Sequence, residues 1–336
     1  MQRGIPVSNP YLYTLVRWVA VGVGMLLLML LTYGLLRAFR ARRSTAAGYA
    51  LILPWLLGLI IWQLFPILYS LYLSFTAYDV LTPPRWVGLK NYVDMFTRDT
   101  RFWPSVRLTV LYSVISVPLG VLGALGTASL LAREVRGIGF WRTLYYVPAV
   151  LPAAATALLW RWMFASRGLI NSLLSPVYRL LNMEPLSWFS DERLVLPSFI
   201  IMSFWGVFGA NTVILLAALK NVPKELKEAA LVDGAGPWTV FSRITVPMIS
   251  PALLYVTIMG VIGAMQNFTA PLFIATPSSA GTFLNVYVYQ QGFTQFKMGY
   301  ASAVAWFLMV LILILTAIVW KWSDAYVYYE GELRQR

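Results

Sequence analysis

The sequence has 336 residues, of which 59% are hydrophobic and only 12% are charged, and its mean hydropathy is +0.69. Soluble domains carry about twice that share of charge, so the composition excludes an ordinary soluble protein and predicts a membrane protein. The net charge of +13 is scattered over the segments between apolar runs, which favours orientation in a bilayer and attraction to anionic lipid over nucleic-acid binding. The absence of Cys and His excludes disulfides, thiolate and Ser-His nucleophiles and the usual zinc sites.

Seven apolar runs are long enough to cross a hydrocarbon core as helices, which takes about 20 residues. They cover residues 16–36, 44–78, 108–132, 143–162, 194–219, 249–275 and 300–320. The runs are continuous rather than alternating, which favours helices over a membrane barrel. The predicted fold is therefore all-α, a polytopic membrane helical bundle of about seven transmembrane helices.

The first run, 16–36, is too long for a signal peptide and lacks a small-residue cleavage site, so we interpret it as a retained span. Four arginines follow it within 37–43, and such a cluster next to a span marks a cytoplasmic loop. Seven spans then place the N-terminus outside and the C-terminus in the cytoplasm. On this topology the segments 78–107 and 166–193 are external, and 220–244 is cytoplasmic.

The segment 220–251, between the fifth and sixth runs, carries the most specific pattern of the chain. A helix over 223–232 would begin at a proline, whose missing N–H costs nothing in the first turn. Gly234 and Gly236 follow where a helix would end in the left-handed conformation, and Pro237 can open a second short helix. The pattern predicts a helix-turn-helix along the membrane, with a face of small residues that suits a groove on another protein.

This segment resembles the EAA signature of the permease subunits of ATP-binding-cassette importers. The matching residues are Glu228-Ala229-Ala230, Asp233-Gly234-Ala235, Phe241, Ile244, Pro247 and Pro251. The resemblance extends over about 49–322 and points to the carbohydrate branch, on the side of the first permease of maltose and glycerol-3-phosphate importers. It implies an extra N-terminal transmembrane helix with a basic linker (1–47), a permease core (48–322) that contains the EAA loop, and a cytoplasmic tail (323–336).

The function implied by the resemblance is that of a multi-pass subunit of the cytoplasmic (inner) membrane that forms half of a pathway for a sugar or a related neutral polyol or oligosaccharide. The implied partners are a second homologous permease, two ATPase subunits and an extracytoplasmic solute-binding protein. ATP and Mg would be bound by the ATPase subunits. This chain has no Gly-rich phosphate loop with Lys-Ser/Thr, so we expect no enzymatic activity, no catalytic residue, no metal and no cofactor of its own.

Within the loop, the resemblance implies a coupling helix that docks into a cleft on an ATPase subunit. We expect Glu228 to make a polar or ionic contact with the ATPase, the alanines to form a close-packing surface, and Asp233 to cap the second helix. The full set of predicted coupling residues is Glu228, Ala229, Ala230, Asp233, Gly234, Ala235 and Gly236.

Polar and aromatic residues on the two spans that flank the loop are candidates for the solute path: Ser203, Trp205, Asn211, Tyr255, Gln266 and Asn267. Amides offer donors and acceptors to hydroxyls, and an aromatic face stacks on a sugar ring. Buried amides also join helices, and Trp and Tyr also lie at membrane interfaces, so both interpretations stay open. The segment 244–296 has no charged residue, which favours a neutral solute.

Three alternatives remain at this point. One is an importer permease for another solute, such as glycerol-3-phosphate, its diesters or a polyamine. The others are an ion-driven secondary transporter and an intramembrane enzyme, both of which usually place ionisable groups inside spans. The seven predicted spans hold no Asp or Glu, which disfavours these two.

Overall fold

The computed structural model describes residues 10–132, 137–207, 209–277, 280–323 and 327. The predicted cytoplasmic tail, 323–336, lies outside the described residues except for Ser323 and Val327. The chain divides into two compact units, Met1–Tyr72 and Leu73–Arg336. The domain boundaries at 47 and 322 rest on the resemblance and stay a prediction.

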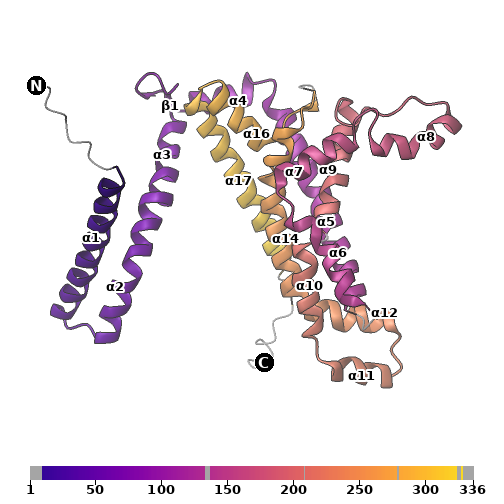
Figure 1. Ribbon diagram of the computed structural model, residues 1–336, viewed down its shortest axis with the longest axis horizontal. Coiled ribbons are helices and arrows are strands. Elements are labelled where there is room, and N and C mark those ends of the chain that lie inside the picture. The colour runs from indigo at the N-terminus through magenta and orange to yellow at the C-terminus, as the bar shows by residue number, and fades with distance from the viewer. Residues whose placement is uncertain (1–9, 133–136, 208, 278–279, 324–326, 328–336) are drawn as a thin grey trace, which may run out of the picture. The chain divides into compact units, whose positions relative to one another are not determined.

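The first unit is a helical hairpin that continues into a long apolar helix (Figure 1). α1 (Pro10–Ala38) and α2 (Arg43–Gly58) pack against each other, and the four-arginine segment spans the turn between them. α2 continues through the π-helical turn η1 (Leu59–Leu64) into α3 (Phe65–Ser74), giving one apolar helix of 32 residues. Pro54 lies inside α2, which neighbouring helices in a membrane make tolerable.

The second unit is a helical bundle with one short hairpin. Its strands are β1 (Thr76–Ala77) and β2 (Arg85–Trp86). Its helices are α4 (Lys90–Thr97), α5 (Phe102–Leu131), α6 (Ile138–Val150), α7 (Ala153–Met163), α8 (Leu169–Leu181), α9 (Glu192–Val207), α10 (Ala210–Lys220), α11 (Lys224–Val232), α12 (Pro237–Val240), η2 (Phe241–Thr245), α13 (Val246–Met248), α14 (Ser250–Met265), α15 (Thr269–Phe273), α16 (Leu284–Tyr289), η4 (Gln290–Thr294) and α17 (Met298–Ser323).

α5 is the central helix of this bundle. It packs against α9, α10 and α14, and α14 also packs against α17. Small residues on α5 make this close packing possible, because Ala124 and Ala128 are fully buried beside Leu215 of α10 and Val256 of α14. α5 therefore positions the helices on either side of the loop that carries α11.

Five helices among the described residues are long and apolar enough to cross a membrane: Tyr11–Ala38, Arg43–Ser74, Phe102–Leu131, Ser250–Phe273 and Met298–Ser323. A sixth span results if α9 and α10, which are bent relative to each other, count as one. The predicted all-α membrane bundle is confirmed. The second span ends at Ser74 instead of 78, and the third begins at Phe102 instead of 108.

The remaining predicted run, 143–162, coincides with two shorter helices. α6 ends at Val150 and α7 begins at Ala153, with Leu151 in an extended conformation between them. Pro152 explains the break, because a residue that precedes proline is pushed out of the helical region. Each of the two pieces alone is shorter than the length that crosses a bilayer, so this run provides a seventh span only if α6 and α7 together count as one broken span.

Candidate functional site

The two ends of the second unit carry different structures. Figure 1 shows α11 and α12 at one end, and α4, α8 and α16 at the other. Between the ends, a cavity lies among the packed helices. Each of these three places holds residues with functional potential.

α11 is held at its two ends and exposed between them. Val222 before α11 and Val240 after it are buried, whereas every residue of α11 itself is at least partly exposed. Several exposed side chains of the loop are apolar: Leu226, Leu231 and Val232 on α11, and Trp238 on α12, which is 75% exposed. Burying such side chains against a partner would be favourable, so this loop presents a surface that has polar, small and apolar residues together.

The end of α11 is a Schellman motif, which stops the helix sharply. Gly234 has a φ of +83°, a conformation that glycine adopts without the steric cost of a Cβ. The N–H of Gly234 donates to the carbonyl of Leu231 at 3.1 Å, and the N–H of Ala235 donates to the carbonyl of Ala230 at 2.9 Å. These are the two hydrogen bonds that define the motif. The predicted glycine stop is therefore confirmed at Gly234, whereas Gly236 is not left-handed: its φ is −70° and it is the N-cap of α12.

The structure places the predicted coupling residues on and just after α11. Ala230 and Ala235 are half-buried, and the remaining members of the set are exposed. Asp233 is the C-cap of α11, whereas the N-cap of α12 is Gly236 and has no side-chain capping bond. The expectation that Asp233 caps the second helix is wrong, because three residues, 234–236, separate Asp233 from Pro237, where α12 begins. The roles of the set toward a partner stay predictions.

The cavity between the ends has a volume of about 220 Å³ and lies among α5, α9, α10 and α14. It brings together three predicted path residues, Ser203, Asn211 and Asn267, with Tyr112 and Ser116 of α5. The side chains around it are uncharged, and they offer hydroxyls, amides and one aromatic ring. These groups match the hydrogen-bonding needs of a neutral hydroxylated solute.

The other three predicted path residues lie elsewhere. Trp205 packs edge-to-face on Trp160 at 5.9 Å between ring centroids. Tyr255 is 53% exposed on α14. Gln266 follows α14, and its backbone carbonyl accepts a hydrogen bond from the side-chain amide of Asn285 at 2.9 Å. Sequence reasoning missed Tyr112 and Ser116 because it considered only the spans adjacent to the loop, although their i,i+4 spacing in a predicted span was visible.

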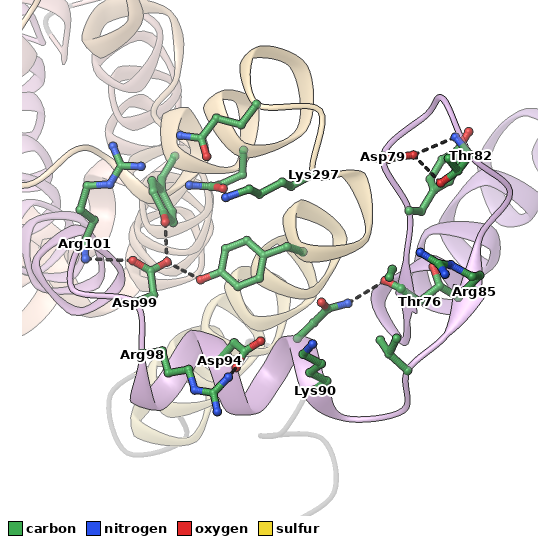
Figure 2. Close-up of a pocket in the computed structure, with 18 residues that line it drawn as sticks. Thr76, Asp79, Thr82, Arg85, Lys90, Asp94, Arg98, Asp99, Arg101 and Lys297 are labelled. Atoms are coloured by element: carbon green, nitrogen blue, oxygen red, sulfur yellow. Dashed lines mark hydrogen bonds and ion pairs between the residues drawn. The ribbon is translucent and has the colours of Figure 1, made fainter.

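At the end opposite α11, a cleft of about 580 Å³ lies among the β-hairpin, α4, the start of α5, η4 and α17 (Figure 2). The hairpin is antiparallel, with Thr76 opposite Trp86. The side-chain amide of Asn91 donates to the carbonyls of Ser74 and Thr76 at 2.9 Å each. These bonds fasten α4 to the strand that forms one wall of the cleft.

The hairpin also packs closely on α17. The N–H of Gly299 donates to the carbonyl of Tyr78 at 3.1 Å. A Cβ on Gly299 would lie 2.0 Å from the carbonyl oxygen of Thr76, far inside the contact distance, so glycine alone permits this approach. The wall and the helix therefore meet through backbone atoms.

Asp99 connects three segments of the cleft. Its carboxylate accepts short hydrogen bonds from the hydroxyls of Tyr287 on α16 and Tyr300 on α17, and it also accepts a bond from the N–H of Arg101 at 2.9 Å. Burial alone would raise the pKa of Asp99, but the hydrogen bonds from Tyr287, Tyr300 and the backbone outweigh it and lower the pKa. We call this arrangement of Asp99, Tyr287 and Tyr300 the carboxylate clamp.

The opposite shift occurs at the Tyr287 hydroxyl. Burial raises the pKa of Tyr287, and its hydrogen bond to Asp99 raises it further. The hydroxyl therefore stays protonated and keeps donating to the ionised carboxylate at neutral pH. The guanidinium of Arg101 lies 5.5 Å from the centroid of the Tyr287 ring, which adds a cation–π contact.

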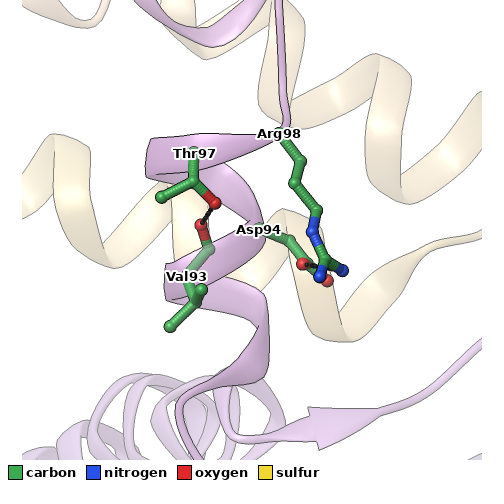
Figure 3. Close-up of polar contacts among 4 residues, drawn as sticks. All are labelled: Val93, Asp94, Thr97 and Arg98. Atoms are coloured by element: carbon green, nitrogen blue, oxygen red, sulfur yellow. Dashed lines mark hydrogen bonds and ion pairs between the residues drawn. The ribbon is translucent and has the colours of Figure 1, made fainter.

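A local ion pair lies on α4, at the edge of the cleft. Arg98 donates to Asp94 at 2.9 Å, and the neighbouring Thr97 hydroxyl donates to the carbonyl of Val93 at 2.7 Å (Figure 3). Such an exposed i,i+4 pair contributes about 0.3–0.5 kcal/mol. Sequence reasoning treated the whole segment 78–107 as an external interface loop and missed this cleft, although the mixture of acidic and basic residues there was visible.

Comparison with known proteins gives a consistent family assignment. The family described as "binding-protein-dependent transport system inner membrane component" matches residues 107–327. The chain is 37% identical over 297 residues to the "probable ABC transporter permease protein YesP" of Bacillus subtilis, with 87% of this chain and 94% of that protein covered. It is 30% identical over 278 residues to the "lactose transport system permease protein LacF" of Rhizobium radiobacter, covering 80% and 91%.

The fold is similar to that of a solved bacterial ABC transporter involved in the import of the acidic polysaccharide alginate. The TM-score is 0.72, the alignment covers 86% of this chain and 99% of that chain, and the sequences are 21% identical. At this identity the likeness concerns the fold alone. It extends the similarity beyond the residues that match the family.

Proposed function

Since this chain belongs to the family of binding-protein-dependent transport system inner membrane components, we propose that it is the permease subunit of an ATP-driven importer for a sugar or a related neutral polyol or oligosaccharide. It forms half of the translocation pathway and works by alternating access. A second, homologous permease supplies the other half, and an extracytoplasmic solute-binding protein delivers the solute.

The observation that carries this proposal is the exposed α11 at one end of the bundle. The helix is anchored by buried residues on both sides and stopped by a Schellman motif, so it is a short rigid body with a free surface. A rigid helix held in a moving cleft can transmit a rigid-body motion to the helices that flank it. In this chain those helices are α10 and α14, which both pack on α5.

The uncharged cavity supports the choice of a neutral solute. Asn211 and Asn267 face the same cavity as Ser203, and unpaired charge is costly inside a membrane. A hydroxylated solute can exchange its hydrogen bonds with water for bonds to these amides and hydroxyls. LacF, the relative named for lactose transport, is consistent with this class.

The proposal also includes the orientation of the chain in the membrane and the source of energy for transport. α11 lies on the cytoplasmic side of the inner membrane, where ATPase subunits bind ATP and Mg, and the N-terminus lies outside while the C-terminus lies in the cytoplasm. The chain itself contributes no catalytic residue. Glu228 makes the polar contact with the ATPase, beside the close-packing Ala229.

The experiment reconstitutes the chain in proteoliposomes with its candidate partner permease, ATPase subunits and binding protein. We expect solute-stimulated ATP turnover and uptake only in the complete mixture. The variant Glu228→Arg should abolish co-purification of the ATPase and reduce uptake by at least about tenfold, since reversing a charge in an interface costs a few kcal/mol. Membrane insertion should be unchanged, because Glu228 is exposed.

A matched control is Glu184→Arg, the same charge reversal at an exposed residue in the loop between α8 and α9. It should leave ATPase co-purification intact. Normal co-purification with Glu228→Arg would contradict the coupling role. Uptake driven by an ion gradient in the chain alone would contradict the importer.

A further inference from the structure

The cleft at the end opposite α11 holds more positive than negative side chains. Five basic residues and three acidic residues surround it. Each acid is already engaged: Asp79 accepts bonds from the N–H and the hydroxyl of Thr82 at 2.8 Å each, Asp94 pairs with Arg98, and Asp99 forms the carboxylate clamp. Apart from the pair of Asp94 with Arg98, no ion pair joins these acids to the cations of the cleft in the described structure.

Four basic side chains therefore face the cleft without an acidic partner. They are Arg85 of β2, Lys90 at the start of α4, Arg101 at the start of α5 and Lys297 just before α17. Within the described part of the chain, none of them forms an ion pair. Figure 2 shows them distributed around the recess, on separate elements. Like charges gathered around one hollow attract an anion, which relieves their mutual repulsion.

The remaining side chains of the cleft suit a hydroxylated ligand. Gln295 contributes an exposed amide and Tyr78 a half-buried hydroxyl, whereas Thr76, Tyr287 and Gln291 of the lining are buried. The volume of about 580 Å³ falls within the range of small-molecule sites, which is about 300–1,000 Å³. It admits a sugar ring and is too small for a folded domain.

Hydrogen bonds within the chain already connect the walls of the cleft. The carboxylate clamp joins the segment before α5 to α16 and α17, and Asn91 joins α4 to the β-hairpin. A preformed site loses less conformational entropy on binding than a flexible one. The elements that carry the cations are thus held together by hydrogen bonds within the chain.

From this geometry we infer that the cleft binds a small hydroxylated carboxylate of the size of a sugar acid. The carboxylate lies among Arg85, Lys90, Arg101 and Lys297, where the planar guanidinium groups match its two oxygens. The amide of Gln295 and the hydroxyl of Tyr78 bind hydroxyls of the ring. This site shares no lining residue with the uncharged cavity that we propose for the transported solute.

The test uses the full chain, purified alone in nanodiscs of neutral lipid, with D-galacturonate as the probe. D-galactose is the matched neutral sugar, and D-galactose 6-phosphate is the matched phosphate. We expect saturable binding of galacturonate by calorimetry, a rise in the unfolding temperature through ligand linkage, and affinity at least about tenfold higher than that of galactose. The affinity should fall as salt is added, because these cations are exposed.

Substitutions locate the site. Arg85→Gln and Lys297→Gln should each weaken galacturonate binding by about tenfold, as expected for one charged hydrogen bond. Arg179→Gln is the control, since Arg179 is an exposed arginine of α8 outside the cleft, and it should leave the affinity unchanged. The unfolding temperature without ligand should be similar in all three variants.

Several results would overturn the inference. These are no binding of galacturonate at millimolar concentration, equal affinity for galactose, stronger binding of the phosphate than of the carboxylate, or an equal loss with Arg179→Gln. Because the measurement needs neither ATPase nor binding protein, a negative result leaves the importer proposal untouched. A failed transport assay would likewise leave this inference untouched.

Discussion

The two ends of the second unit differ in how much of their surface is bonded within the chain. At the α11 end, two buried valines and a Schellman motif hold a helix whose own residues all remain accessible. At the cleft end, Asn91 of α4 donates to the Thr76 carbonyl of the hairpin, and Tyr287 of α16 and Tyr300 of α17 both donate to Asp99. The α11 surface is therefore accessible to a partner, whereas most polar groups of the cleft already form hydrogen bonds or ion pairs within the chain.

This difference predicts where a substitution is detected. A change to a residue of the cleft end that is bonded within the chain, such as Asp99 or Gly299, should alter the stability of the chain alone. A change on the α11 surface should leave the stability of the chain alone unchanged and should be detected only when a partner is present. Three measurements on the chain alone test the first half of this statement.

The largest effect is expected from Gly299→Ala. The new Cβ would meet the Thr76 carbonyl oxygen at 2.0 Å, and because backbone cannot yield as a flexible side chain does, the β-hairpin must separate from α17. Overpacking of this kind costs about 1–3 kcal/mol. The unfolding temperature of the purified chain should therefore fall by several degrees.

The control is Gly126→Ala on α5, toward the α11 end. A Cβ there has nothing within 4 Å, and alanine is the better helix former. The control should be neutral or slightly stabilising. If both variants lose the same stability, the backbone contact between the hairpin and α17 is not important and the comparison of the two ends fails.

A smaller effect is expected from Asp99→Asn, which removes the charge from the carboxylate clamp. Charged hydrogen bonds contribute about 1.5–3 kcal/mol when buried, and partial exposure reduces this to about 1 kcal/mol here. The free energy of unfolding of the chain in detergent, measured with a denaturant, should fall by that amount. Tyr287→Phe should reproduce part of the loss, because it removes one donor and keeps the ring.

Asp191→Asn is a matched control for Asp99→Asn. Asp191 accepts a hydrogen bond from the N–H of Arg193 at 2.9 Å, as Asp99 does from Arg101, but Asp191 is exposed and belongs to no clamp of tyrosines in the described structure. It should lose clearly less stability. Equal losses would assign the effect to the local turn instead of the clamp.

The fold class was predictable from the sequence because continuous apolar runs have a direct physical meaning in a membrane. The ends of the helices were less predictable. The run 44–78 includes β1, a strand of two residues, which is too short to show a strand pattern in the sequence. α5 begins at Phe102, before the apolar run, because a helix can carry a charged residue such as Arg107 outside the apolar part of the span. The break at Pro152 was visible as a residue, but its effect depends on packing.

The candidate sites divide in the same way. The stop of α11 at Gly234 was predictable, because a Schellman motif is local and glycine marks it. The carboxylate clamp was not predictable, since Asp99 and Tyr287 are 188 positions apart in the chain. The meeting of Tyr112 with Asn267 in the central cavity is likewise a product of tertiary packing, which no local pattern encodes.

The smallest effect expected is a pH dependence that stays flat near neutrality. The folded pKa of Asp99 lies below its ordinary value of 3.8, so the clamp contributes stability that is present above that value and lost as the pH falls through the folded pKa. The pKa of Tyr287 is raised, so its hydroxyl keeps its proton. The stability difference between the natural chain and Asp99→Asn should therefore be constant from about pH 5 to about pH 8 and shrink only below about pH 4. A difference that already shrinks between about pH 7 and about pH 5 would mean that the two hydroxyls do not hold the carboxylate ionised, and the cleft end would then lose the internal bonding that distinguishes it from α11.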